Sequence, residues 1–169
     1  MPRKKDLTKD AVLLNALRIN LSLLGEIAMR YEVETKPERP DAPPSIITPQ
    51  DVHRLLGPEM SALAQEQLRV LLLDIKSNVV GQRIIYQGTV NSADVRAAEV
   101  LRPAVVAAIP KIIVSHNHPS NDPTPSPEDV ACTRQLAQAA KLLGIELVDH
   151  IVIGGDRFVS LRERGLIPH

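Results

Sequence analysis

The sequence is poor in three features that would assign a chain to a class at once: cysteine, an excess of one charge, and long apolar runs. It holds a single cysteine, Cys132, among 169 residues. That count excludes an internal disulfide framework and any zinc site built from several cysteines. A lone cysteine is typical of a reducing compartment, so we expect a cytoplasmic protein.

Charge and hydropathy exclude further classes. Twenty Lys and Arg residues balance 20 Asp and Glu residues, so no net field attracts the chain to nucleic acid or to an anionic membrane. No apolar stretch approaches the ~20 residues that a membrane-spanning helix needs. The amino-terminal residues superficially resemble a signal peptide, but Asn15, Arg18 and Asn20 interrupt the apolar run and no small-residue cleavage site follows. We therefore expect no export, no membrane partner and no strong direct nucleic-acid binding.

Apolar residues at steps of three and four predict one amphipathic helix over residues 9–33. The stripe consists of Leu13, Leu17, Leu21, Leu24, Ala28 and Tyr31. We interpret it as a docking or self-association surface, which makes a homo-oligomer possible. Prolines at positions 37, 40, 43, 44 and 49 exclude both a helix and a central strand in the next segment. The predicted organisation is an N-terminal helix over 1–35, a Pro-rich linker over 36–48 and a domain over 49–169.

The domain is predicted to begin with a short helix capped by Thr48, with Pro49 at its first position, and to end that helix at Gly57-Pro58. Strands are expected at 68–74 and 79–87, then a helix at 93–109 with a kink or early end at Pro103. A strand at 111–116, a helix at 126–144 and a hairpin over 146–161 complete the domain. This order, ββαβαββ, predicts an α/β fold with a mixed sheet flanked by helices.

Two histidines end the predicted strand at 111–116, in the tetrapeptide HNHP at 116–119. Residues two apart on a strand face the same side, so His116 and His118 can converge on one point. After six intervening residues Ser126 caps the next predicted helix, and Asp129 in its first turn can lean back toward the histidines. Two imidazoles and one carboxylate leave the fourth position of a tetrahedral zinc for water, as in catalytic zinc sites. The sequence therefore predicts a Zn²⁺ site with the ligands His116, His118 and Asp129.

Each half of this pattern is weak when it stands alone. The tetrapeptide SPED at 126–129 is also an acidic variant of a capping box, whose role is structural. Two histidines and a carboxylate also describe the iron site of non-haem oxygenases. The ordered combination of HNHP, six residues and SPED, placed between a strand and a helix, is what makes the pattern specific.

The combination resembles the JAMM signature of the MPN-domain metalloproteases. Three segments, GTVNSADV at 88–95, SHNHPSNDPTPSPEDV at 115–130 and LLGIELVDHIVIG at 142–154, are more narrowly similar to the bacterial RadC family. The resemblance covers about residues 46–167. It implies the MPN fold, in which a curved mixed sheet lies between helices and which is related in shape to cytidine deaminases.

The resemblance also implies roles. In JAMM proteases the two histidines and the aspartate hold zinc, the serine steadies the oxyanion, and a glutamate that opens an early strand acts as general base. The resemblance thus implies that Ser126 steadies the oxyanion and that Glu66, just before the strand at 68–74, is the general base. Glu99 is the rival base, because it matches a glutamate in a segment typical of RadC proteins. Asn121 replaces the glycine usual in RadC proteins, and asparagine tolerates the left-handed backbone that such a glycine serves.

Adjacent residues Asp149 and His150 must point to opposite faces of their strand, so at most one reaches the histidine side. That residue either orients a ligand or fills an ordinary buried or surface position. We predict a zinc-dependent peptidase or isopeptidase that hydrolyses an amide bond of a peptide or protein substrate. The alternative is a DNA-repair-associated or accessory protein whose MPN domain is not a protease. RadC proteins commonly carry helix-hairpin-helix units before this domain, whereas residues 1–45 contain no glycine-centred hairpin.

Overall fold

A five-stranded mixed sheet lies at the centre of the computed structural model, which describes residues 43–88 and 95–167. The strands are β1 (Gln67–Leu73), β2 (Val79–Gln87), β3 (Lys111–Asn117), β4 (Glu146–Gly154) and β5 (Arg157–Ser160). Their spatial order is β2-β1-β3-β4-β5. The β3–β4 pair is parallel and the other three pairs are antiparallel. The parallel pair includes the central strand, β3, and helix α4 connects its two strands.

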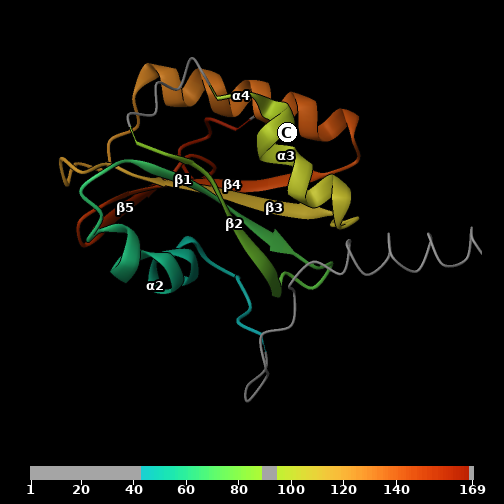
Figure 1. Ribbon diagram of the computed structural model, residues 1–169, viewed down its shortest axis with the longest axis horizontal. Helices are drawn as coiled ribbons and strands as arrows, with labels where there is room; N and C mark the ends of the chain where they lie inside the picture. The colour runs from blue at the N-terminus through green and yellow to red at the C-terminus, as the bar shows by residue number, and fades with distance from the viewer. Residues whose placement is uncertain (1–42, 89–94, 168–169) are drawn as a thin grey trace, which may run out of the picture. The chain divides into compact units, whose positions relative to one another are not determined.

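Three helices cover the sheet within the described residues. Helix α2 (Pro49–Met60) packs on one face, whereas α3 (Ala97–Val106) and α4 (Pro127–Leu142) pack on the other (Figure 1). Strand β1 is buried along its whole length because helices cover both of its faces. Burial on both faces is why its sequence is a nearly continuous apolar run and does not alternate.

Alternation along the strands divides the core into two layers. Leu68, Val70, Leu72, Ile112 and Val114 point to the side of α3 and α4. The intervening residues Leu71, Leu73 and Ile113 point to α2, together with Ile151 and Ile153 from β4. His116 continues the row of Ile112 and Val114, so this histidine belongs to the face that α4 covers.

The predicted element order is confirmed, and both predicted hairpins are present. Thr48 is the N-cap of α2 and Ser126 that of α4, and a proline follows each of them. The predicted end of α2 at Gly57-Pro58 is wrong, because the helix continues to Met60 with Pro58 inside it. A proline in the last turn removes only its own N–H, and Ser61 N–H still donates to the Gly57 carbonyl at 2.9 Å.

Helix α3 likewise passes through Pro103 and ends one turn later, at Val106. The predicted helix at 9–33 and the boundary at 35 lie outside the described residues. These predictions, and the boundary at 48, stand as predictions. Among the helices that the structure describes, none combines the length and the apolar character needed to cross a bilayer.

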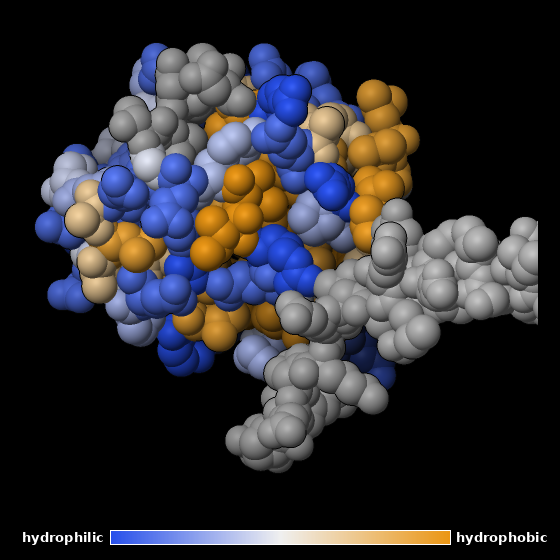
Figure 2. All heavy atoms as spheres, viewed as in Figure 1, coloured by the Kyte–Doolittle hydropathy of each residue, from blue (hydrophilic) through white to orange (hydrophobic). Residues whose placement is uncertain are grey.

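The visible surface of the described domain mixes polar and apolar residues, with apolar groups separated by hydrophilic ones (Figure 2). Exposed apolar side chains include Val105 and Val106 at the end of α3 and Leu142 and Leu143 at the end of α4.

Candidate metal centre

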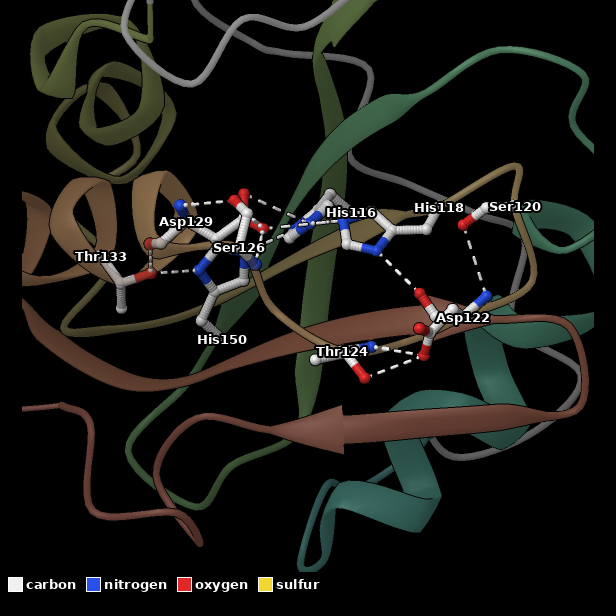
Figure 3. A network of polar contacts seen from close by, with 9 residues as sticks. All are labelled: His116, His118, Ser120, Asp122, Thr124, Ser126, Asp129, Thr133 and His150. Atoms are coloured by element: carbon white, nitrogen blue, oxygen red, sulfur yellow. Dashed lines mark hydrogen bonds and ion pairs between the residues drawn. The ribbon is translucent and has the colours of Figure 1, made fainter.

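The two histidines of the HNHP segment lie at the carboxyl end of β3. His116 is within the strand and is almost fully buried, whereas His118 follows its last residue and is partly buried. The His118 N–H donates to the Ile153 carbonyl of β4 at 2.8 Å, which extends the sheet past the end of β3. As a result the two Nε2 atoms lie 3.0 Å apart and face the start of α4 (Figure 3).

Asp129 reaches the same point from the first turn of α4. Its Oδ2 accepts from the Ser126 hydroxyl at 2.7 Å and from the Ser126 N–H at 2.8 Å, and its own N–H donates to that hydroxyl at 3.1 Å. The carboxylate is thereby fixed, with Oδ1 3.5 Å from His116 Nε2 and Oδ2 3.6 Å from His118 Nε2. The structure thus brings together all three residues that the sequence suggested as ligands.

The orientation of His118 depends on the backbone of the following loop. Its Nδ1 lies 2.8 Å from the Asp122 carbonyl oxygen, which can only accept, so Nδ1 carries the proton. In the neutral ring Nε2 then holds the lone pair, as a metal ligand must. The loop itself is placed by Gly154, where an added Cβ would lie 2.5 Å from Pro123 N. Asn121 in this loop has φ 62°, the left-handed conformation expected because Asn121 replaces the glycine usual in RadC proteins.

His116 is held by side chains from distant elements. Its Nδ1 lies 2.8 Å from Nε2 of His150 on β4, and His150 Nδ1 lies 2.6 Å from the Thr133 hydroxyl on α4. His150 is buried, and burial lowers its pKa to about 3, so the ring is neutral. Asp149, its neighbour, points to the opposite face and accepts from the Ser160 hydroxyl at 2.5 Å. The expectation that only one of the pair faces the histidines is confirmed.

Glu66 approaches the histidines from the side of β1. One carboxylate oxygen of Glu66 and the ring nitrogens of His116 and His118 all lie within 4.8 Å of one another. Burial raises the pKa of the Glu66 carboxyl, while the two imidazoles oppose that rise. Among the described residues, the structure shows no side-chain hydrogen bond to this carboxylate.

The rival glutamate lies elsewhere. Glu99 is in the first turn of α3, where its carboxylate pairs with the Arg96 guanidinium and accepts from the Tyr86 hydroxyl. These two partners hold the pKa of Glu99 below its ordinary value. The Glu99 carboxylate thus interacts with an arginine and a tyrosine, and it is not part of the group formed by Glu66, His116 and His118.

Three atoms that can each present a lone pair therefore face one another at the centre. Burial opposes ionisation of Asp129, but the two imidazoles and Ser126 outweigh it and hold the pKa of this carboxyl well below its ordinary value. Asp129 in turn raises the pKa of His118. Both directions favour a positive charge beside the Asp129 carboxylate, which a proton or a metal ion can supply.

The spacing fits a metal ion. Ligand atoms ~2.0–2.1 Å from a tetrahedral zinc lie roughly 3.3–3.4 Å apart, close to the separations seen among these three side chains. Two carboxylates compete for the third ligand position, because Glu66 also lies within reach of both histidines. Asp129 suits a ligand better, since it is ionised and fixed by Ser126, whereas Glu66 has a raised pKa and no such anchor.

Sequence reasoning missed two residues of this centre, Thr133 and Asn117. Thr133 lies four residues after Asp129, so helical spacing alone places both on one face of α4. The Asn117 amide accepts from Gln67 N–H at 2.8 Å and donates to the Gln65 carbonyl at 3.1 Å. The Asn117 side chain therefore hydrogen-bonds to the backbone on both sides of Glu66. No local signal predicts that role, because it depends on the pairing of β1 with β3.

Comparison with known proteins identifies the class. The family model described as RadC-like JAB domain matches residues 46–166. A UPF0758 protein of Chloroflexus aurantiacus is 55% identical over 121 residues, which cover 72% of this chain and 53% of the relative. Corresponding proteins of Roseiflexus castenholzii and Shouchella clausii are 51% and 41% identical, over 72% and 89% of this chain and 52% and 64% of their own lengths.

The chain belongs to the RadC-like JAB domain family, and its mixed α/β sheet with helices on both faces is the JAB/MPN fold. The resemblance to RadC proteins seen in the motifs is confirmed. JAB domains include metallohydrolases, and the group at Glu66, His116 and His118 can hold a metal ion. The chain spans about half the length of the Chloroflexus and Roseiflexus relatives and less than two thirds of that from Shouchella.

Proposed function

We propose that this domain is a zinc-dependent hydrolase that cleaves an amide bond in a peptide or protein, as a metallopeptidase or isopeptidase. The observation that carries the proposal is the convergence of His116 Nε2, His118 Nε2 and the Asp129 carboxylate at 3.0–3.6 Å, with a second, unanchored carboxylate, Glu66, beside them. A ligand set plus a separate base is what metal-assisted hydrolysis requires.

His116, His118 and Asp129 would hold the ion. When bound, zinc supplies a Lewis acid that polarises a carbonyl and lowers the pKa of a bound water to about 7. Two neutral imidazoles and one carboxylate leave an open position for water, which distinguishes this set from a closed structural site. The membership of the chain in the JAB family supports zinc over the iron of non-haem oxygenases.

Glu66 acts as the general base in this proposal. Its carboxylate takes a proton from the attacking water, whose oxygen forms a bond to the amide carbon. The same proton then passes to the amine nitrogen as the carbon–nitrogen bond breaks, which returns Glu66 to its starting state. A pKa raised by burial suits both transfers, because the group must accept and donate near neutral pH.

Ser126 is placed to steady the oxyanion that forms on the carbonyl oxygen. In the resting structure its hydroxyl donates to Asp129 Oδ2, with the two oxygens 2.7 Å apart. Rotation about the Cβ–Oγ bond of Ser126 would redirect that proton to a substrate oxygen, while Oγ still accepts from the Asp129 N–H and the Ser126 N–H keeps its bond to Asp129. The residue thus combines a structural cap with a donor for the transition state.

A peptide or protein is the substrate class that this chemistry favours. Direct tight binding of DNA is not expected, because the sequence carries no net positive charge. The alternative, an accessory role in DNA repair without proteolysis, would be favoured by submicromolar affinity for duplex DNA at physiological salt. Fluorescence anisotropy of a labelled duplex over a salt series distinguishes the two.

Metal analysis is the first test. Protein purified without a histidine tag or chelator should contain about one zinc per chain, measured by inductively coupled plasma mass spectrometry. The His116→Ala, His118→Ala double variant should contain almost none, while its circular dichroism spectrum stays that of the wild type. Full zinc loading in this folded double variant would refute the site assignment.

A further inference from the structure

We propose that Thr133 and His150 are positioning residues that fix His116 in the tautomer whose Nε2 faces the metal site. The inference rests on the proposed metal site and adds two residues that have no contact with the ion itself. Thr133 is fully buried on α4, and His150 is buried on β4. They connect Asp129 to His116 by a chain of three short polar contacts, which we call the tautomer relay (Figure 3).

The relay starts at a group whose role is fixed. The Asp129 backbone carbonyl can only accept, and it lies 2.6 Å from the Thr133 hydroxyl oxygen. The single hydroxyl proton of Thr133 is therefore used in that bond. The contact of 2.6 Å between Thr133 Oγ1 and His150 Nδ1 then requires a proton on Nδ1, since otherwise two lone pairs would meet.

The remaining protons follow from this start. A neutral His150 protonated at Nδ1 has its lone pair at Nε2, which lies 2.8 Å from His116 Nδ1. His116 must then carry its proton at Nδ1 and donate it to His150. The lone pair of neutral His116 is left at Nε2, the atom that lies 3.0 Å from His118 Nε2 and 3.5 Å from Asp129 Oδ1.

The reverse order is excluded by the carbonyl. If Thr133 donated to His150, its oxygen and the Asp129 carbonyl oxygen would lie 2.6 Å apart with no proton between them. The relay therefore has one direction, and a backbone atom of one proposed ligand, Asp129, sets the tautomer of another, His116. His118 reaches the same state separately, through the Asp122 carbonyl.

The expected consequence is a loss of metal affinity when the relay is cut. Partners that orient a metal-bound histidine typically contribute about 10–100-fold to metal affinity. Thr133→Val removes the hydroxyl at nearly constant shape, whereas Thr133→Ser keeps it and is the matched control. His150→Gln keeps an acceptor for His116 Nδ1, whereas His150→Leu does not.

The test measures tautomers and affinity in the full-length chain. Protein labelled with ¹⁵N-histidine is freed of metal, and long-range ¹H–¹⁵N spectra at pH 8 report which nitrogen of each ring is protonated. We expect Nδ1–H for both His116 and His150 in the wild type and in Thr133→Ser. Thr133→Val and His150→Leu should lose this preference at His116 and bind zinc about 10–100-fold more weakly in competition with a chromogenic chelator.

Two results would overturn the relay: an Nε2–H tautomer of His116 in the wild type, or unchanged zinc affinity in folded Thr133→Val. His150→Gln gives a second route to the answer if Thr133→Val does not fold, because it should retain more affinity than His150→Leu. The tautomer measurement needs neither metal nor turnover. A proton on Nδ1 of His116 in a protein that binds no zinc would therefore support the relay and reject the proposed function. Zinc binding of equal affinity in the wild type and Thr133→Val would support the metal site and reject the relay.

Discussion

Two helices of this domain begin with nearly the same four residues, TPQD at 48–51 and SPED at 126–129. In both, the aspartate turns back to the capping residue: Thr48 N–H and hydroxyl donate to Asp51 Oδ2 at 2.8 and 3.0 Å, as Ser126 does to Asp129. The difference lies in the second carboxylate oxygen. Asp51 Oδ1 pairs with the exposed guanidinium of Arg54, whereas Asp129 Oδ1 faces the buried ring of His116.

The comparison teaches that a capping box can supply a metal ligand, as proposed for Asp129, only through what the sheet brings to it. The local chemistry fixes one oxygen in each helix and leaves the other directed outward from the first turn. At α2 that oxygen meets a flexible arginine on the same helix. At α4 the carboxylate meets two histidines, His116 in β3 and His118 just after it.

Replacing the aspartate in each cap should give the largest contrast. Asp129→Asn should lower zinc affinity by more than about 100-fold, the upper range for residues that merely orient a ligand, and abolish turnover with it. Asp51→Asn should bind zinc and turn over substrate as the wild type does. Chelator competition and a peptide-cleavage assay measure both properties. Equal zinc affinity in the two variants would contradict the distinction between the caps.

The proposed base separates turnover from binding. Glu66→Gln should keep the fold and the bound zinc but reduce kcat about 10²–10⁴-fold, the usual contribution of a general acid–base group. Glu99→Gln is the matched control, because that carboxylate pairs with Arg96 and Tyr86 away from the histidines. Loss of cleavage in Glu99→Gln with activity retained in Glu66→Gln would transfer the role of base to Glu99.

Removal of the capping hydroxyls should have a smaller effect that sharpens the comparison. Ser126→Ala and Thr48→Ala should each lower the free energy of unfolding by about 0.5–2 kcal/mol, as loss of an N-cap typically does, measured by urea denaturation. Only Ser126→Ala should also weaken zinc binding, because its hydroxyl fixes Asp129. A comparable change in zinc affinity for Thr48→Ala would show that the effect is one of general stability.

The smallest expected effect is the loss of the stabilising contribution of Asp51 at acidic pH. Hydrogen bonds from the Thr48 and Ile47 N–H groups lower the pKa of Asp51 from 3.8 to about 2. A carboxyl whose pKa is lower in the folded state than in the unfolded state stabilises the protein at pH values above its unfolded-state pKa. That stabilisation is lost as the pH falls through its folded-state pKa. The melting temperature of the wild type should therefore exceed that of Asp51→Asn at pH 5, and the difference should shrink between pH 4 and 2. A constant difference would exclude this linkage.

Sequence alone predicted the parts of the molecule that depend on local chemistry. The order of helices and strands, the two capped helix starts and the joint position of His116, His118 and Asp129 all follow from periodicity and spacing. Glu66 came only from family resemblance, because a glutamate at the end of a loop carries no pattern of its own. The end of α2 was misplaced, because Pro58 sits in a last turn that tolerates it.

Two residues at the centre could not be assigned from the sequence for one physical reason: Asn117 was not predicted, and His150 was left between an orienting role and an ordinary position. His150 and Asn117 act through the register of strands far apart in sequence, with His150 opposite Val114 and Asn117 opposite Ile153 in the parallel pair. A register shift between Ile112 and Ile113 decides which face of β4 meets the histidines. No spacing rule within one segment encodes such a shift.

Gly154 has a consequence for how this domain can diverge over time. Any side chain there would collide with the backbone of the 121–123 loop, 2.5 Å from Pro123 N and 2.7 Å from the Asp122 carbonyl carbon. The loop holds His118 through the main-chain oxygen of residue 122, so a substitution of the residue 122 side chain leaves that hydrogen bond intact. A substitution of Gly154 would displace the loop and break it. In a related domain that no longer bound the proposed metal, the loop would not need to hold His118, and a side chain at 154 would be tolerated. Replacement of this glycine would then indicate loss of the site even where HNHP and SPED are retained.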